Sequence, residues 1–289
     1  MILKQHEHSN LWVNYKNKGE NFCGDGEKMR FIDAHIHLSD EEYDDIINEI
    51  ISEAKNNNIV ALVSNSMDLK TSVKSLKLAE KYPKLVYAAL GIHPWNTANV
   101  TEEDLAKTIE IISKEKENKN EALVAIGEIG LDYKYTKVWE KQLKIFEEML
   151  HLAEKLNLPV IIHSRGTTTQ IVEMLPSFNL NKVLLHWFSR PISALKKAIE
   201  HNYYITEGPP TAYSNGIREV VRRTPLTNLL TETDGPVRYF KKPFNGKRTT
   251  PAFIPTVVEA IAEIKSLKVE EVADQIIKNF EEFFNVKLN

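Results

Sequence analysis

The chain has 289 residues, in which 37 Lys and Arg stand against 40 Asp and Glu, so its net charge is −3. This balance excludes a polycation, and any contact with nucleic acid must come from a local patch. Apolar residues make up 42% and no apolar run approaches the roughly 18–20 residues that cross a bilayer, which predicts a globular chain without membrane contact. The single Cys23 and the absence of a hydrophobic signal segment favour the reducing cytoplasm.

Residues 1–28 differ in composition from the rest of the chain. They are polar, contain Gly19, Gly24 and Gly26, and show no sustained hydrophobic period. We expect a poorly ordered N-terminal extension, or else a start codon placed too early, followed by one domain that spans residues 29–289.

From Met29 onward, short β-like runs alternate with longer helix-like ones. We predict strands near 31–35, 59–64, 85–91, 122–128, 158–163, 182–186, 203–207 and 228–232. The predicted helices are 40–57, 70–82, 102–117, 138–156, 167–176, 191–201, 215–223, 254–265 and 269–284. Eight strands with intervening helices predict a single-domain α/β fold, a closed parallel TIM-type (β/α)₈ barrel rather than an open sheet.

A pair of histidines lies at the end of the first predicted strand, in the segment FIDAHIHL. His35 and His37 are two residues apart, so on a strand both side chains point to the same face. Asp33 shares this face and could orient a ligand imidazole by accepting a hydrogen bond from it. Two strand histidines that merely pack would be the alternative, but further ligand-type residues at other strand ends favour metal binding.

Four more potential ligands each end a short apolar run: Glu128, His163, His186 and Asp234. Catalytic groups in a (β/α)₈ barrel lie at the strand ends, so this spacing predicts one convergent site. Imidazoles and carboxylates bind divalent ions such as Zn²⁺, Mg²⁺ or Mn²⁺ that activate water, which predicts a metal-dependent hydrolase. A buried Glu128 could bridge two ions, and Asp234 could bind one ion while it accepts the proton of the attacking water.

Two further residues are predicted to contact the substrate. His93, in the segment GIHPW, follows the third strand and could contact the leaving group, or could instead stabilise the turn before Pro94. Arg165 follows His163 at the barrel rim, where its planar fork could clamp a phosphate or form a salt bridge at a helix start.

A basic and aromatic segment follows Asp234. Residues 235–258 contain no Asp or Glu, and the basic and aromatic members are Arg238, Tyr239, Phe240, Lys241, Lys242, Phe244, Lys247 and Arg248. Such residues neutralise phosphates and stack unpaired bases, so we predict that Lys247 or Arg248 contacts a phosphate of a nucleic acid. An ordinary solvated loop is the alternative.

These segments, in this order, resemble the TatD family of metal-dependent deoxyribonucleases within the amidohydrolase-like barrels. The resemblance covers about 29–255 and rests on FIDAHIH, GIHP, AIGEIGLDY, PVIIHSR, LHWFS and LLTETDGP. It implies a TIM-type barrel, two or three divalent ions, and hydrolysis of DNA phosphodiesters, often from the 3′ end of a single strand. The metal ligands that it implies are His35, His37, Glu128, His163, His186 and Asp234.

Two departures from the family pattern bear on substrate preference. Trp187 stands where many members have a small or thiol residue. Many members also carry Asn-Glu-Pro late in the chain, where this one reads Gly246–Pro251 and has no acidic residue. Related barrels cleave amides, lactones and phosphotriesters, and a deacylase acting on mischarged, D-aminoacyl-tRNA is an alternative. A bridging carboxylated Lys would favour those enzymes, whereas Glu128 in that role favours the nuclease. A non-catalytic DNA-binding subunit is a third reading, against which the intact ligands argue.

Overall fold

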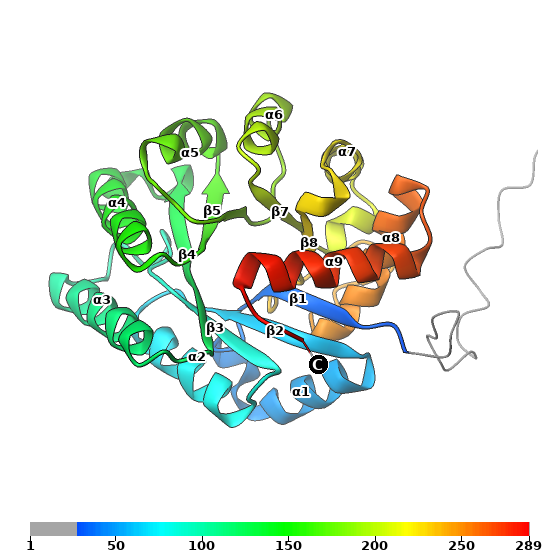
Figure 1. Ribbon diagram of the computed structural model, residues 1–289, viewed down its shortest axis with the longest axis horizontal. Helices are drawn as coiled ribbons and strands as arrows, with labels where there is room; N and C mark the ends of the chain where they lie inside the picture. The colour runs from blue at the N-terminus through cyan, green and yellow to red at the C-terminus, as the bar shows by residue number, and fades with distance from the viewer. Residues whose placement is uncertain (1–27, 289) are drawn as a thin grey trace, which may run out of the picture.

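The computed structural model describes residues 28–288 and shows eight parallel strands in one sheet, with the order β1 to β8. The strands are β1 (Phe31–Ile36), β2 (Ile59–Asn65), β3 (Val86–Leu90), β4 (Leu123–Asp132), β5 (Val160–Arg165), β6 (Val183–Leu185), β7 (Tyr204–Glu207) and β8 (Leu229–Thr231). Helices follow the strands and surround the sheet (Figure 1). The predicted single-domain TIM-type barrel is therefore confirmed. The expected extension 1–28 lies, except for Lys28, outside the described residues.

The chain just after β8 joins the last strand to the first. The backbone N–H of Asp234 donates to the carbonyl of His35 (2.9 Å), and that of His37 donates to the carbonyl of Gly235 (2.8 Å). The hydroxyl of Thr231 donates to the carbonyl of Ile32 (2.7 Å). Because these bonds join β1 to the segment that carries Asp234, they bring this carboxylate beside the two histidines of β1.

The helices agree closely with the sequence pattern. They are α1 (Ile47–Asn56), α2 (Leu69–Lys81), α3 (Glu102–Glu117), α4 (Trp139–Leu156), α5 (Thr168–Met174), α6 (Ile192–Glu200), α7 (Asn215–Arg223), α8 (Ile254–Lys265) and α9 (Val269–Phe284). The short 3₁₀ helices are η2 (Glu41–Ile46), η3 (Tyr133–Val138), η4 (Leu175–Ser177), η5 (Pro209–Ala212), η6 (Leu226–Asn228) and η7 (Pro251–Phe253). None of the helices in the described residues is long and apolar enough to cross a membrane.

The helix expected over 40–57 is divided in two. It begins as the 3₁₀ helix η2 and continues as α1 after Ile46, whose φ/ψ of −124°/8° interrupts the helical backbone. Tyr43 in η2 is fully buried, and its hydroxyl donates to the carbonyl of Thr249 (2.7 Å). The first turn is thus fixed to the segment before η7, which explains why it does not continue the axis of α1.

Helix α9 covers the end of the barrel at which the strands begin, and Figure 1 shows it crossing in front of the strands. The ring of Phe280 lies 6.2 Å from that of Tyr87 in β3, and the ring of Phe283 lies 5.0 Å from that of Tyr204 in β7. Burial of large aromatic side chains contributes about 1.5–3 kcal/mol each. Helix α9 therefore packs over this end beside β1 and β8, and the strand carboxyl ends are left for chemistry.

Strand β4 is longer than expected and reaches Asp132. The extension depends on Gly130, whose φ of +149° favours glycine and whose Cβ would lie 2.1 Å from the carbonyl oxygen of His163. Without a side chain at this position, β4 passes close to β5 with Gly130 paired to His163 and Asp132 paired to Arg165.

Candidate metal centre

The six predicted ligands converge at the carboxyl ends of the strands. His35 and His37 come from the end of β1, and Glu128 and His163 come from β4 and β5. His186 and Asp234 follow β6 and β8. All six side chains are buried, with at most 9% of each residue exposed.

Glu128 lies at the centre of the cluster and divides it in two. Its Oε2 is 3.2 Å from Nε2 of His35 and 3.3 Å from Nε2 of His37. Its Oε1 is 3.0 Å from Nδ1 of His163 and 2.9 Å from Nε2 of His186. One carboxylate therefore faces two separate pairs of imidazoles, the arrangement expected of a ligand that bridges two ions.

Asp234 completes the first of these groups. Its Oδ1 lies 3.5 Å from Nε2 of His35 and 3.4 Å from Nε2 of His37. Asp234 has a φ of +50°, a left-handed conformation that Asp tolerates better than most residues. The conformation turns its carboxylate inward over the barrel, toward the two histidines.

The second ring nitrogen of two ligand imidazoles has an acceptor. Nδ1 of His37 donates to the carbonyl of Asn65 (3.1 Å), and Nε2 of His163 donates to Oδ2 of Asp132 (3.0 Å). Such partners fix the ring and its tautomer, so that the remaining nitrogen points its lone pair at an ion.

His186 has the same arrangement, since its Nδ1 lies 3.3 Å from Oε2 of Glu232 while its Nε2 faces Glu128. Asp132 was not singled out from the sequence, although a signal existed. It lies four residues after Glu128, which places both side chains on one face of an extended strand.

His93 belongs to the cluster but differs from the ligand imidazoles. Its Nδ1 accepts the backbone N–H of Trp95 (3.1 Å), so the ring proton lies on Nε2, which is 3.1 Å from Oε1 of Glu128. Burial lowers the pKa of His93 to about 4, which keeps the ring neutral. In this tautomer Nε2 is a hydrogen-bond donor and offers no lone pair to a metal ion.

Asp33 does not orient an imidazole, contrary to the expectation from the sequence. Its carboxylate accepts the backbone N–H of His35 (3.2 Å) and of Thr233 (3.0 Å), together with the Thr233 hydroxyl. It therefore fixes the backbone that carries His35 and Asp234, because two buried N–H groups need an acceptor here.

The residues present fit divalent ions. Two sets of side chains place one ligand atom each within 4.8 Å of one another: His35, His37 and Asp234; and His35, His186 and Glu232. Glu128 and His163 meet the same distance together with His93, whose ring in its present tautomer is a donor and not a ligand. In the described residues, Oε2 of Glu128 and Nε2 of His35 are buried without a hydrogen-bond partner. Such atoms are costly to bury unless they bind a cation.

The charge of the cluster is balanced by protons on several imidazoles. Burial opposes ionisation of Glu128, but the surrounding imidazoles outweigh it and hold its pKa well below the usual range. Burial also opposes protonation of His37, yet its hydrogen bond to Asp234 and the charge of Glu128 raise its pKa to about 9. The pKa values of His163 and His186 are raised as well, despite burial, chiefly by Asp132 and Glu128 respectively.

We therefore expect ion binding to release protons. Below about pH 9 the proton on His37 competes with an ion for Nε2, so affinity should rise with pH toward this value and fall as the pH is lowered. Calorimetric titration of Mn²⁺ into metal-stripped protein, in two buffers of different ionisation enthalpy at pH 6.5 and 8.5, measures the release. Equal affinity at both pH values with no proton release would contradict this protonation scheme.

The three cationic residues predicted to bind substrate are placed differently. Arg165 donates from Nε to Oδ1 of Asp132 (2.9 Å), and its Nη2 lies 2.9 Å from Oδ2 of Asp132, so it adjoins the cluster. Lys247 and Arg248 line a cavity of about 330 Å³ against α1 and η7. In the described part of the chain neither contacts a cluster residue through a hydrogen bond or ion pair.

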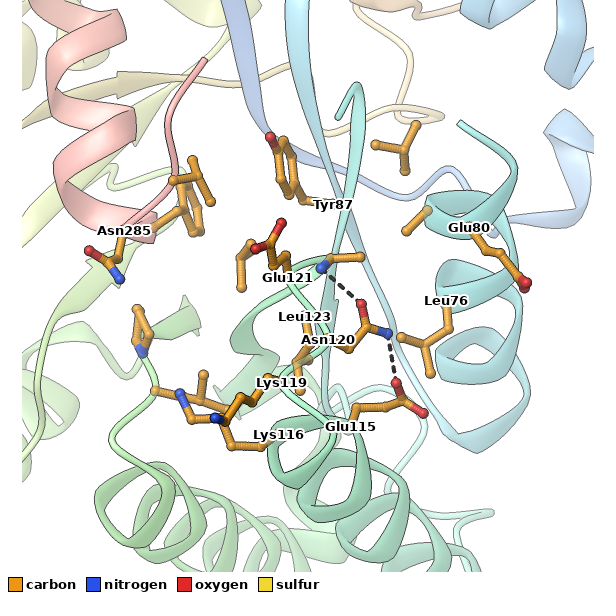
Figure 2. Close-up of a pocket in the computed structure, with 18 of the residues that line it drawn as sticks. Leu76, Glu80, Tyr87, Glu115, Lys116, Lys119, Asn120, Glu121, Leu123 and Asn285 are labelled. Carbon is orange, nitrogen blue, oxygen red and sulfur yellow. Dashed lines mark hydrogen bonds between the residues drawn. The ribbon is translucent and has the colours of Figure 1, made fainter. Parts of the chain in front are cut away.

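A wider cavity, of about 1670 Å³, lies at the opposite end of the barrel, where β3 to β6 begin. Figure 2 shows Asn120 inside it, which donates to Glu115 (2.6 Å) and accepts from the backbone N–H of Ala122 (3.0 Å). Its lining contains no histidine, and the metal-type cluster lies at the other strand ends. Size therefore does not identify the reaction site in this molecule, whereas the ligand chemistry does.

A TIM-type barrel with a buried carboxylate–imidazole cluster at its strand carboxyl ends defines a metal-dependent hydrolase. The family model described as TatD related DNase matches residues 32–285. The chain belongs to this family.

Several known proteins resemble the chain over nearly its whole length. It is 35% identical to the uncharacterized metal-dependent hydrolase YabD of Bacillus subtilis, covering 88% of this chain and 98% of that protein. It is 32% identical to the deoxyribonuclease TATDN3 of Homo sapiens, covering 86% and 92%. The crystal structure of YjjV, a TatD homologue from Escherichia coli, superposes with a TM-score of 0.82 at 28% identity, covering 90% and 99%.

Proposed function

We propose that this hydrolase cleaves DNA phosphodiester bonds and removes nucleotides from the 3′ ends of single strands, with divalent ions that Glu128 and the imidazoles around it would hold. The observation that carries the proposal is the position of the Glu128 carboxylate. Its Oε2 faces the His35/His37 pair, and its Oε1 faces the His163/His186 pair. Two-ion sites are suited to in-line displacement at phosphorus. A human relative bears the name deoxyribonuclease, which supports DNA as the substrate.

Each group around the cluster has a part in the proposed reaction. When bound, the ions supply an activated water and neutralise charge on the phosphate. Asp234 accepts the proton of the water as it attacks phosphorus, while the bond to the departing oxygen breaks. His93 donates a hydrogen bond from Nε2 to an oxygen of the reacting phosphate, and one terminal nitrogen of Arg165 remains for a second oxygen.

Lys247 and Arg248 have a more distant part in this proposal. The groove that they line against α1 would bind the strand away from the scissile bond, as expected of phosphate contacts that position a substrate. Hydrolysis of an amide or of an aminoacyl ester is less well supported, since the bridging position is held by Glu128 and not by a lysine. The convergence of all six ligands also argues against a subunit without activity.

The test is digestion of a 5′-labelled single-stranded oligonucleotide with Mg²⁺ or Mn²⁺, beside the His35→Ala/His37→Ala double variant. We expect a ladder of products shortened from the 3′ end, which disappears in the variant and on chelation. A folded, ion-loaded protein that leaves DNA intact but hydrolyses aminoacyl or amide substrates would overturn the proposal.

A further inference from the structure

An aromatic and cationic surface adjoins the metal-type cluster. Trp95 follows β3, Tyr135 lies in η3 after β4, and Arg165 ends β5; we call these three residues the aromatic shelf. The rings of Trp95 and Tyr135 are 6.2 Å apart, and the guanidinium of Arg165 lies 5.2 Å from the centre of the Trp95 ring. Trp95 remains 38% exposed.

The indole of Trp95 is held in place although it is exposed. Its Nε1 donates to Oδ2 of Asp132 (2.6 Å), the oxygen that also accepts Nε2 of His163 (3.0 Å). Arg165 donates to Oδ1 of the same carboxylate (2.9 Å). One buried carboxylate thus fixes a ligand imidazole and two members of the aromatic shelf, so the indole has a defined position relative to the cluster.

The aromatic shelf lies within one nucleotide of the reacting groups. The Trp95 ring is perpendicular to the His93 ring at 4.9 Å, and its centre is 6.1 Å from that of His163. Two of the nitrogens of Arg165 are occupied by Asp132, whose charge offsets that of the guanidinium. A planar guanidinium whose charge is offset by a neighbouring carboxylate is better suited to stacking on a base than to attracting phosphates over a long distance.

We propose that the aromatic shelf stacks the nucleobase next to the scissile phosphodiester, so that the enzyme selects an unstacked base in single-stranded DNA. The inference rests on the proposed DNase function. Base–aromatic stacking is tolerant of sequence, since every base has a π face. The same contact excludes a base that remains within a duplex, because its faces are already covered by its neighbours.

The experiment compares Trp95→Leu with the wild type on two substrates. One is a single-stranded oligonucleotide, and the other carries base-free tetrahydrofuran spacers at its last two 3′ positions. We expect Trp95→Leu to lower kcat/KM on the first substrate by roughly 5- to 150-fold, the factor for stacking of one base. The spacer substrate should be cleaved slowly by both proteins, at equal rates.

Two further variants separate stacking from a structural role. Trp95→Phe keeps an aromatic face but loses the bond to Asp132, and it should retain a preference for the base-bearing substrate. Leu267→Ala removes another exposed apolar side chain (42% exposed), in the α8–α9 connection, and should leave both rates unchanged. Equal losses on both substrates in Trp95→Leu would overturn the stacking role while the nuclease stands. A wild type that cleaves neither DNA substrate would instead remove the proposed function.

Discussion

Replacing Glu128 by Gln is expected to abolish turnover and to remove ions from the site. Loss of one positioned electrostatic group lowers catalysis by about 10²–10³-fold. Since Glu128 faces both imidazole pairs, we expect kcat/KM for single-stranded DNA to fall by at least roughly a thousandfold. Elemental analysis of the purified protein should show fewer ions per chain.

The same substitution should destabilise the metal-free protein. Removing one partner of a buried ion pair costs about 3–5 kcal/mol, and Glu128 is 1% exposed among imidazoles that its charge helps to protonate. Urea unfolding in EDTA measures this loss of free energy of unfolding. The two readouts are independent, because the second needs no ion and no substrate.

Two neighbouring variants act as matched controls for Glu128→Gln. Glu232→Gln weakens the support of His186 and changes one of the candidate ligand sets, but leaves Glu128 in place, so ion affinity should fall by about 10–100-fold. His93→Ala should keep the full ion content and lose turnover. The backbone N–H of Trp95 donates to Nδ1 of His93, so Nε2 carries the ring proton and donates a hydrogen bond instead of binding an ion. If Glu128→Gln kept both its ions and its turnover, the bridging role would be wrong.

The fold could be predicted from the hydrophobic periodicity of the sequence. Helices 102–117, 215–223, 254–265 and 269–284 match their predicted bounds residue for residue. Thr101 and Asp104 at the start of α3 form the reciprocal cap that such a pair favours. The end of β4 could not be predicted in the same way. The strand continues past Glu128 because Gly130 approaches β5 closely, and this is a tertiary contact.

The candidate site was predictable where a strand end supplied the residue. Each ligand ends an apolar run, so its chain position alone predicts convergence in a closed barrel. The partner of His37 is the carbonyl of Asn65, a group that every residue carries, and sequence offers no signal for it. Lys247 and Arg248 lie in a long segment after β8, whose path toward α1 is set by packing and not by nearness to Asp234 along the chain.

The pairing of Trp95 with Arg165 illustrates a second limit. Each residue has a local role of its own, Trp95 in the turn after β3 and Arg165 at the end of β5, and 70 positions separate them in the chain. Their contact arises because β3, β4 and β5 are consecutive in the barrel and all end at the same rim. Asp132, between them, was visible in the sequence but lay beyond the expected end of its strand.

Replacing Asp234 by Asn should separate proton transfer from substrate binding. Burial opposes ionisation of Asp234, but its hydrogen bond to His37 and the charges of His186 and His35 outweigh it and lower its pKa. The carboxylate is therefore ionised and able to accept a proton, which an amide of the same shape cannot do. We expect kcat to fall by about 10²–10⁴-fold at saturating ion concentration.

Binding of a 3′-phosphorothioate single strand, measured without turnover, should remain within a few-fold of the wild type in Asp234→Asn. A loss of ions that matches the loss of rate would assign Asp234 to ion binding alone, because Oδ1 faces both His35 and His37. Full turnover of Asp234→Ala with its ions bound would show that the proton acceptor is another group. Between these outcomes, a slow variant that retains its ions and still binds DNA identifies Asp234 as the base.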